Sequence, residues 1–198
     1  MTLEPMAMAF SVTLLTVVFL LSGVNKLQAL HTFEGVVYNF RLLPEVFVRP
    51  FAYSLPFVEL ALAVALLIPA ARSYAGWSAA VLLGIFTLAV SINLLRGRRE
   101  IDCGCFSSEL KQRLSSWLLL RNIMLIGLAL WAANSTVAAP YALANIEESL
   151  LGIAAAVMVV IIYAAATMLS VTAQYAAERR SVLMEQVSSD EAMINSNS

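Results

Sequence analysis

The sequence contains little charge and few residues that bind metals. Only 13% of its 198 residues are Asp, Glu, Lys or Arg, whereas soluble globular domains average about 25%. Two cysteines and one histidine are too few for a disulfide-rich secreted scaffold or for a zinc site, which takes about four ligands. Twelve basic and thirteen acidic residues nearly cancel, so no global field favours nucleic acid. We therefore expect no bound metal, no other cofactor and no nucleic-acid partner.

Apolar residues are abundant and cluster in long runs. Hydrophobic residues make up 61% of the chain, and its mean hydropathy is +0.83. Because about 20 apolar residues cross a hydrocarbon layer of ~30 Å as a helix, five segments are candidate spans. They lie at about 6–25, 51–69, 74–95, 115–133 and 150–173. Open strands would leave backbone polar groups unsatisfied in lipid. The sequence thus predicts an all-α membrane protein, a bundle of about five transmembrane helices.

The bundle and the end of the chain differ in composition. Residues 1–177 are expected to form the integral membrane bundle. Small residues in the spans, such as Gly84 and Gly127, favour close approach of neighbouring helices. Residues 178–198 are polar and rich in Ser and Asn, which is typical of a disordered C-terminal tail.

The segment between the first two spans has the pattern of an amphipathic helix. Its apolar residues recur at helical spacing, at Leu30, Phe33, Val37 and Phe40. The polar residues His31, Glu34 and Arg41 lie between them. A helix of this kind lies in the membrane interface. We interpret His31 as an interfacial side chain, because a lone histidine cannot build a metal site.

The basic residues are distributed unequally between the two sides of the predicted bundle. Ten fall on one side: Lys26, Arg41, Arg49, Arg96, Arg98, Arg99, Lys111, Arg113, Arg179 and Arg180. The loops on the opposite side contain only Arg72. Cytoplasmic loops carry the excess of Lys and Arg. We therefore expect a multi-pass membrane protein with its amino terminus outside and its carboxyl terminus in the cytoplasm.

Cys103 and Cys105 are the two cysteines, and Gly104 separates them in the loop between the third and fourth spans. A disulfide needs Cα atoms within roughly 7 Å, and glycine gives the backbone the freedom to bend that far. So small a ring is strained, and strained disulfides are the labile, oxidising ones. The pair therefore favours reversible thiol–disulfide exchange. The alternatives are two inert reduced thiols or a site for a soft metal ion such as Cu(I).

Four polar residues inside or at the ends of the spans are further candidates: Glu59, Lys26, Asn93 and Arg121. Glu59 lies near the middle of the second span, where an ionisable side chain is costly and implies a partner or a function. It can pair with Lys26 or with Arg121 across the bundle. Two roles stay open for such a pair, one that fixes the helix register and one that couples proton or electron transfer.

The run RGRREIDCGCF at 96–106, followed by the pair Arg121–Asn122, resembles the methylamine utilisation protein MauE family. The segments SGVNKL and LPFVELALAVALLIP are similar to the wider family of DoxX-like membrane proteins. The resemblance covers about 10–175. It implies an accessory protein of the bacterial inner membrane that matures a periplasmic amine dehydrogenase, whose small subunit carries many disulfides and a tryptophan-derived quinone. It also implies a thioredoxin-like periplasmic partner, with Cys103 and Cys105 as the redox pair. Ser107 stands where the family motif often has glycine.

Three functions are consistent with these observations. The first is a thiol–disulfide oxidoreductase or electron relay that uses Cys103 and Cys105. The second is a non-catalytic scaffold that holds a thioredoxin-like partner at the membrane. The third is a small quinone-binding or transport bundle, suggested by Glu59 alone. The charge distribution places the cysteines at the cytoplasmic face, although periplasmic disulfides are made outside. Either the helices move to expose the pair outside, or the predicted topology is wrong by one span.

Overall fold

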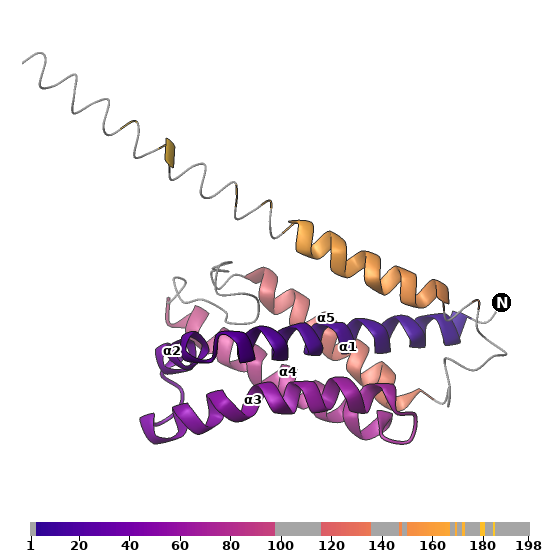
Figure 1. Ribbon diagram of the computed structural model, residues 1–198, viewed down its shortest axis with the longest axis horizontal. Coiled ribbons are helices and arrows are strands. Elements are labelled where there is room, and N and C mark those ends of the chain that lie inside the picture. Colours follow the sequence, from indigo (N-terminus) through magenta and orange to yellow (C-terminus); the bar gives the residue numbers. More distant parts are fainter. Residues whose placement is uncertain are drawn as a thin grey trace, which may run out of the picture. The chain divides into compact units, whose positions relative to one another are not determined.

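Within the residues that the computed structural model describes, all regular structure is helical (Figure 1). The described residues are 3–97, 116–135, 147, 150–166, 169, 172, 179–180 and 184. The helices are α1 (Leu3–Gln28), α2 (Leu30–Phe40), α3 (Glu45–Leu67), α4 (Arg72–Leu95) and α5 (Ser116–Asn134). A further apolar helix covers Leu150–Ala166. The expected all-α fold is confirmed.

The chain divides into two compact units, Met1–Val160 and Ile161–Ser198. The packing described below belongs to the first unit. The predicted tail at 178–198 lies almost entirely outside the described residues.

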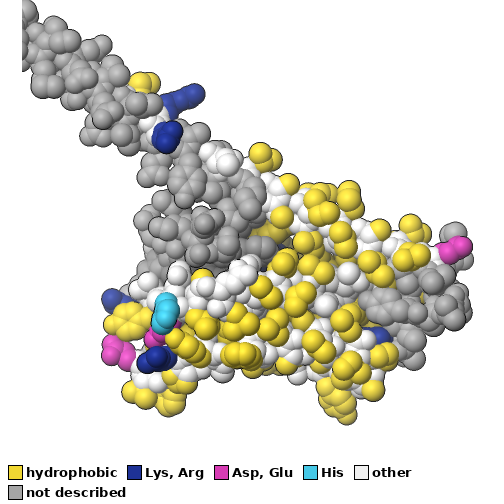
Figure 2. All heavy atoms as spheres, in the orientation of Figure 1, with side chains coloured by type: hydrophobic (Ala, Val, Ile, Leu, Met, Phe, Trp, Pro, Cys, Tyr) yellow, Lys and Arg dark blue, Asp and Glu magenta, His cyan; other side chains and the backbone are white. Residues whose placement is uncertain are grey.

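Three of the helices are long and apolar enough to cross a membrane. They are α1 from Glu4, α3 and α4, with mean hydropathies of 2.2, 1.7 and 2.1. Leu118–Asn134 and Leu150–Ala166 are shorter apolar helices, so about five apolar helices are present, as the sequence predicts. Figure 2 shows hydrophobic side chains covering the middle of the visible face, with the histidine and several charged side chains at one end. A surface of this kind suits hydrocarbon and is rare on soluble monomers. The protein is therefore an all-α membrane protein.

Helix α2 is the amphipathic helix expected after the first span. It buries Phe33, Val36 and Val37 against α3, whereas His31 is exposed. It runs across the end of the long helices rather than along them (Figure 1), as an interfacial helix does. It ends at Phe40 and is capped by Arg41, which has a left-handed backbone (φ 49°) and whose N–H donates to the carbonyl of Tyr38 at 3.1 Å.

The core forms where α1, α3, α4 and α5 meet. Its fully buried residues include Met8, Leu15, Leu66, Ala79 and Ala129. Helix α1 packs on α3 and α5, and α4 packs on α5 and α3. Val90 and Leu118 pack together near the end of α4 and the start of α5.

The glycines that allow close helix approach are not the ones expected. A Cβ placed on Gly84 or Gly127 would meet no atom of the described residues within 4 Å, so the prediction for these two is wrong. They lie on open helix faces. Gly76 lies where α4 closely approaches α5, because a Cβ at this position would come within 2.8 Å of the Ala133 Cβ. Sequence spacing alone does not show which helix face meets a neighbour.

Candidate functional site: a buried ion pair and the cavity beside it

The site begins with a close contact between α1 and α3. Gly23 on α1 lies against α3, and a Cβ there would be 3.0 Å from the Leu60 Cγ and 3.1 Å from the Pro56 carbonyl oxygen. Glycine, which has no side chain, is therefore the residue that lets the two helices approach at this level. Lys26 follows Gly23 by one helical turn, and Glu59 directly precedes Leu60. The close approach brings these two charged side chains together.

Lys26 and Glu59 form a direct ion pair. The Lys26 Nζ donates to the Glu59 Oε1 at 2.5 Å. It also donates to the Ser22 Oγ at 2.6 Å, and the Ser22 hydroxyl donates to the same Glu59 oxygen at 3.2 Å. Ser22 and Lys26 are four residues apart on α1, so they share one helix face. The three side chains make a closed triangle of hydrogen bonds between the helices.

The pair is removed from solvent and enclosed by aromatic rings. Lys26 and Glu59 are each 2% exposed. The Lys26 Nζ lies 5.3 Å from the ring centre of Phe33 on α2 and 5.2 Å from that of Phe86 on α4. Burying each ion costs several kcal/mol in lost hydration. The carboxylate, the Ser22 hydroxyl and the two ring faces offset that cost for the ammonium.

A small cavity, lined mostly by apolar side chains but with a few polar groups in its wall, borders the pair on the side of α5. Its volume is about 30 Å³, and Ser22, Glu59, Arg121 and Asn122 supply its polar walls. The Arg121 Nη2 donates to the Asn122 Oδ1 at 3.2 Å. A cavity of this volume has room for one buried water, which would need these polar groups as hydrogen-bond partners. Glu59 thus faces Lys26 on one side and shares the cavity with Arg121 on the other.

The structure brings three of the four polar candidates together. Lys26 pairs with Glu59, which is one of the two pairings that the sequence allows, and Arg121 borders the same cavity. Asn93 lies apart, because it is two turns, or about 10 Å, beyond Phe86 along α4. It is fully buried, and its Nδ2 donates to the carbonyl of Ala89 at 3.0 Å. Ser22, Phe33 and Phe86 were missed, and only the spacing of Ser22 from Lys26 could have indicated one of them.

Cys103 and Cys105 lie outside the described residues. The helices on either side of them are described. The end of α4 and the start of α5 are joined by the Val90–Leu118 contact, against which Phe40 of α2 packs. The segment that carries the cysteines therefore connects to the bundle at the end where the interfacial helix lies. Among the described residues, no three His, Cys, Asp or Glu side chains gather in a way that could hold a metal ion.

Known proteins are similar to this chain in sequence over most of its length. A sequence profile of the methylamine utilisation protein MauE family matches residues 4–135. The chain is 40% identical over 167 residues to the methylamine utilization protein MauE of Paracoccus denitrificans, covering 84% of this chain and 89% of that protein. The MauE proteins of Methylophilus methylotrophus and Methylorubrum extorquens are 37% and 40% identical, and 87% and 89% of their lengths are covered. No solved structure matches this chain. The chain belongs to the methylamine utilisation protein MauE family.

Proposed function

We propose that this protein is an inner-membrane accessory protein of methylamine utilisation that matures a periplasmic methylamine dehydrogenase by thiol–disulfide exchange. The observation that carries the proposal is the Cys103–Gly104–Cys105 motif, which contains both cysteines of a chain in this family. Two thiols one residue apart can alternate between a strained disulfide and a dithiol. The same chemistry is needed to form or sort disulfides in a substrate protein.

The proposed exchange conserves atoms and electrons. A thiolate of the dehydrogenase small subunit attacks one sulfur of the Cys103–Cys105 disulfide and releases the other as a thiolate. A second substrate thiolate then breaks this mixed disulfide. The substrate gains one disulfide, and the Cys pair gains two electrons and two protons. A disulfide of a thioredoxin-like periplasmic partner reoxidises the pair by the same two steps. Because the charge distribution places the pair at the cytoplasmic face, this exchange requires that the helices move to expose the pair outside.

The bundle serves in this proposal as a rigid support for the redox segment. The Lys26–Glu59 pair links α1 to α3 deep in the core, and Phe40, Val90 and Leu118 join α2 to the ends of α4 and α5. A register-fixing role fits the Lys26–Glu59 geometry, because each helix contributes one charge and the Ser22 hydroxyl contacts both.

The test replaces each cysteine by serine in the full chain. We expect Cys103→Ser and Cys105→Ser each to abolish dehydrogenase maturation while the protein remains in the membrane. Ser108→Ala, in the same segment, is the matched control and should leave maturation intact. Each single-cysteine variant should also trap a mixed disulfide with the small subunit or with the thioredoxin-like partner. Full maturation with both serine variants would contradict the proposal.

A non-catalytic scaffold for the thioredoxin-like partner is the competing function. It predicts that both serine variants still mature the enzyme and still bring the partner to the membrane. It also predicts that no mixed disulfide forms. Co-purification of the partner with wild type and with both serine variants, read on non-reducing gels, therefore separates the two functions.

A further inference from the structure

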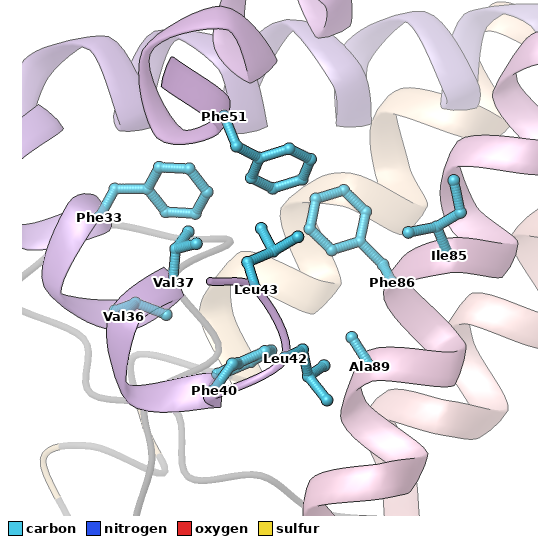
Figure 3. A pocket seen from close by; sticks show the side chains of 10 residues that line it. All are labelled: Phe33, Val36, Val37, Phe40, Leu42, Leu43, Phe51, Ile85, Phe86 and Ala89. Carbon is cyan, nitrogen blue, oxygen red and sulfur yellow. The ribbon is translucent and has the colours of Figure 1, made fainter. Parts of the chain in front are cut away.

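An apolar cavity lies between the interfacial helix and the long helices. Figure 3 shows side chains of α2, the connection after it, α3 and α4 converging on this space. Its volume is about 160 Å³. The described residues that line it are all aliphatic or aromatic, and Leu43 points toward its centre, between Phe51 and Phe86.

The lining determines the kind of molecule that can enter. Cavities of about 150 Å³ lined by Leu, Ile and Phe stay dry and bind small apolar molecules. Water finds no hydrogen-bond partner among such side chains. A hydrocarbon group, by contrast, regains dispersion contacts with the wall. The cavity therefore suits part of an apolar chain.

One wall of the cavity continues onto the outer surface of α4. Ile85 lines the cavity and is also 53% exposed. Val81 and Leu88, at 60% and 63% exposure, extend the same face along the helix. In a membrane helix an exposed apolar face of this kind contacts lipid tails. The hydrocarbon nearest to the cavity is therefore an acyl chain of the bilayer.

The connection after α2 adds positive charge beside the apolar lining. Arg41 is exposed, and it directly precedes Leu42 and Leu43, which both line the cavity. Arg49 lies over the Tyr53 ring at 5.6 Å, so its guanidinium already has a neighbour. The nearest carboxylate in sequence, that of Glu45, accepts a hydrogen bond from the Tyr38 hydroxyl at 3.2 Å. Guanidinium groups bind phosphate oxygens strongly.

We propose that the cavity binds one acyl chain of an anionic phospholipid whose phosphate lies at Arg41. Each feature contacts a different part of one lipid molecule. The apolar lining and the continuous α4 surface contact the acyl chains, and the cation at the interface contacts the phosphate. This site is separate from the cysteine chemistry, so its failure and that of the proposed function are distinguishable.

The experiment uses the full chain in detergent with phosphatidylglycerol that carries a photoreactive diazirine in one acyl chain. We expect irradiation to attach it mainly to peptides containing Leu42–Leu43 and Ile85–Ala89, as located by mass spectrometry. Unlabelled phosphatidylglycerol should reduce this labelling in a saturable way, and phosphatidylcholine should compete several-fold more weakly. Equal competition by both lipids, or labelling spread evenly over the exposed faces of α3 and α4, would overturn the proposal.

Two pairs of variants make the test specific. Ala89→Phe fills the cavity and should lower the labelling several-fold, whereas Ala61→Phe, on an exposed face of α3, should not. Arg41→Asn removes the charge, and asparagine tolerates the left-handed backbone at this position. It should abolish the preference for phosphatidylglycerol, whereas Arg49→Gln should retain it. Unchanged labelling in Ala89→Phe, or displacement of the lipid by an isoprenoid quinone but not by phosphatidylglycerol, would contradict the assignment.

Discussion

At the scale of single residues, the Lys26–Glu59 pair is the most constrained feature of the described core. Both side chains are almost fully buried, and the 2.5 Å contact is supported by Ser22. A buried pair contributes little net stability compared with apolar residues of the same shape. Replacing one partner, however, leaves the other charge buried without its counter-ion. Neutralising one partner is therefore a sharper test of the pair than replacing both partners.

Glu59→Gln should destabilise the protein by about 3–5 kcal/mol, because it leaves the Lys26 ammonium buried without a carboxylate. The measurement is reversible unfolding of the purified protein in detergent. The double variant Lys26→Met with Glu59→Gln removes the stranded cation and should recover a large part of the loss. A single variant as stable as wild type, or a double variant as unstable as the single one, would show that the pair does not hold α1 to α3.

At the scale of helices, packing depends on which glycines meet a neighbour. Gly76 and Gly84 are both on α4, eight residues apart. A Cβ on Gly76 would lie 2.8 Å from the Ala133 Cβ and 2.9 Å from the Ala129 carbonyl oxygen of α5, whereas a Cβ on Gly84 would meet none of the described residues within 4 Å. A backbone carbonyl cannot move aside as a flexible side chain can, so the helices themselves must separate.

Gly76→Ala should therefore destabilise the protein by about 1–3 kcal/mol through overpacking. Gly84→Ala is the matched control on the same helix, and it should be neutral or stabilising, since alanine favours the helix by about 1 kcal/mol over glycine. Thermal unfolding of the two variants in the same detergent provides the comparison. Equal stability of the two would mean that α4 and α5 do not approach as closely as described.

Helices could be predicted from sequence better than their contacts. Long uncharged runs indicated the apolar helices, and the spacing of Phe33 and Val37 indicated α2. The cost of a buried charge indicated that Glu59 has a partner, but the choice between Lys26 and Arg121 depends on how the helices are rotated. The position of Phe33 near Lys26 depends on how α2 turns away from the end of α1. The position of Phe86 depends on a contact between helices far apart in sequence, which no local pattern encodes.

At the scale of the whole molecule, the open question is which face of the membrane carries the cysteines. The charge distribution predicts a cytoplasmic position. Lys26 is buried in its ion pair and so does not act as a loop charge, but nine of the ten basic residues on that side remain. Arg72, on the opposite side, is itself only 4% exposed. The asymmetry that underlies the proposed orientation is therefore kept.

Labelling with a membrane-impermeant maleimide tests this orientation directly. Cys103 and Cys105 should react in inverted membrane vesicles, as the charge distribution predicts. They should also react, more slowly, in intact cells whose outer membrane has been permeabilised, because the proposed exchange with periplasmic thiols requires exposure outside. The variant lacking both cysteines gives the background. Strong labelling from the periplasmic side alone would reverse the proposed topology. Labelling from both sides would indicate that the segment is exposed alternately to the two compartments.

Two phenylalanines have a consequence for how the protein responds to its surroundings. Phe33 and Phe86 line the apolar cavity and also lie near the buried ammonium of Lys26. The same two aromatic rings therefore stand between the cavity and the charge inside the bundle. If an acyl chain occupies the cavity as proposed, a lipid that shifts these rings should alter the electrostatic shielding of that charge, and the stability of the core should then depend on the membrane as well as on the chain.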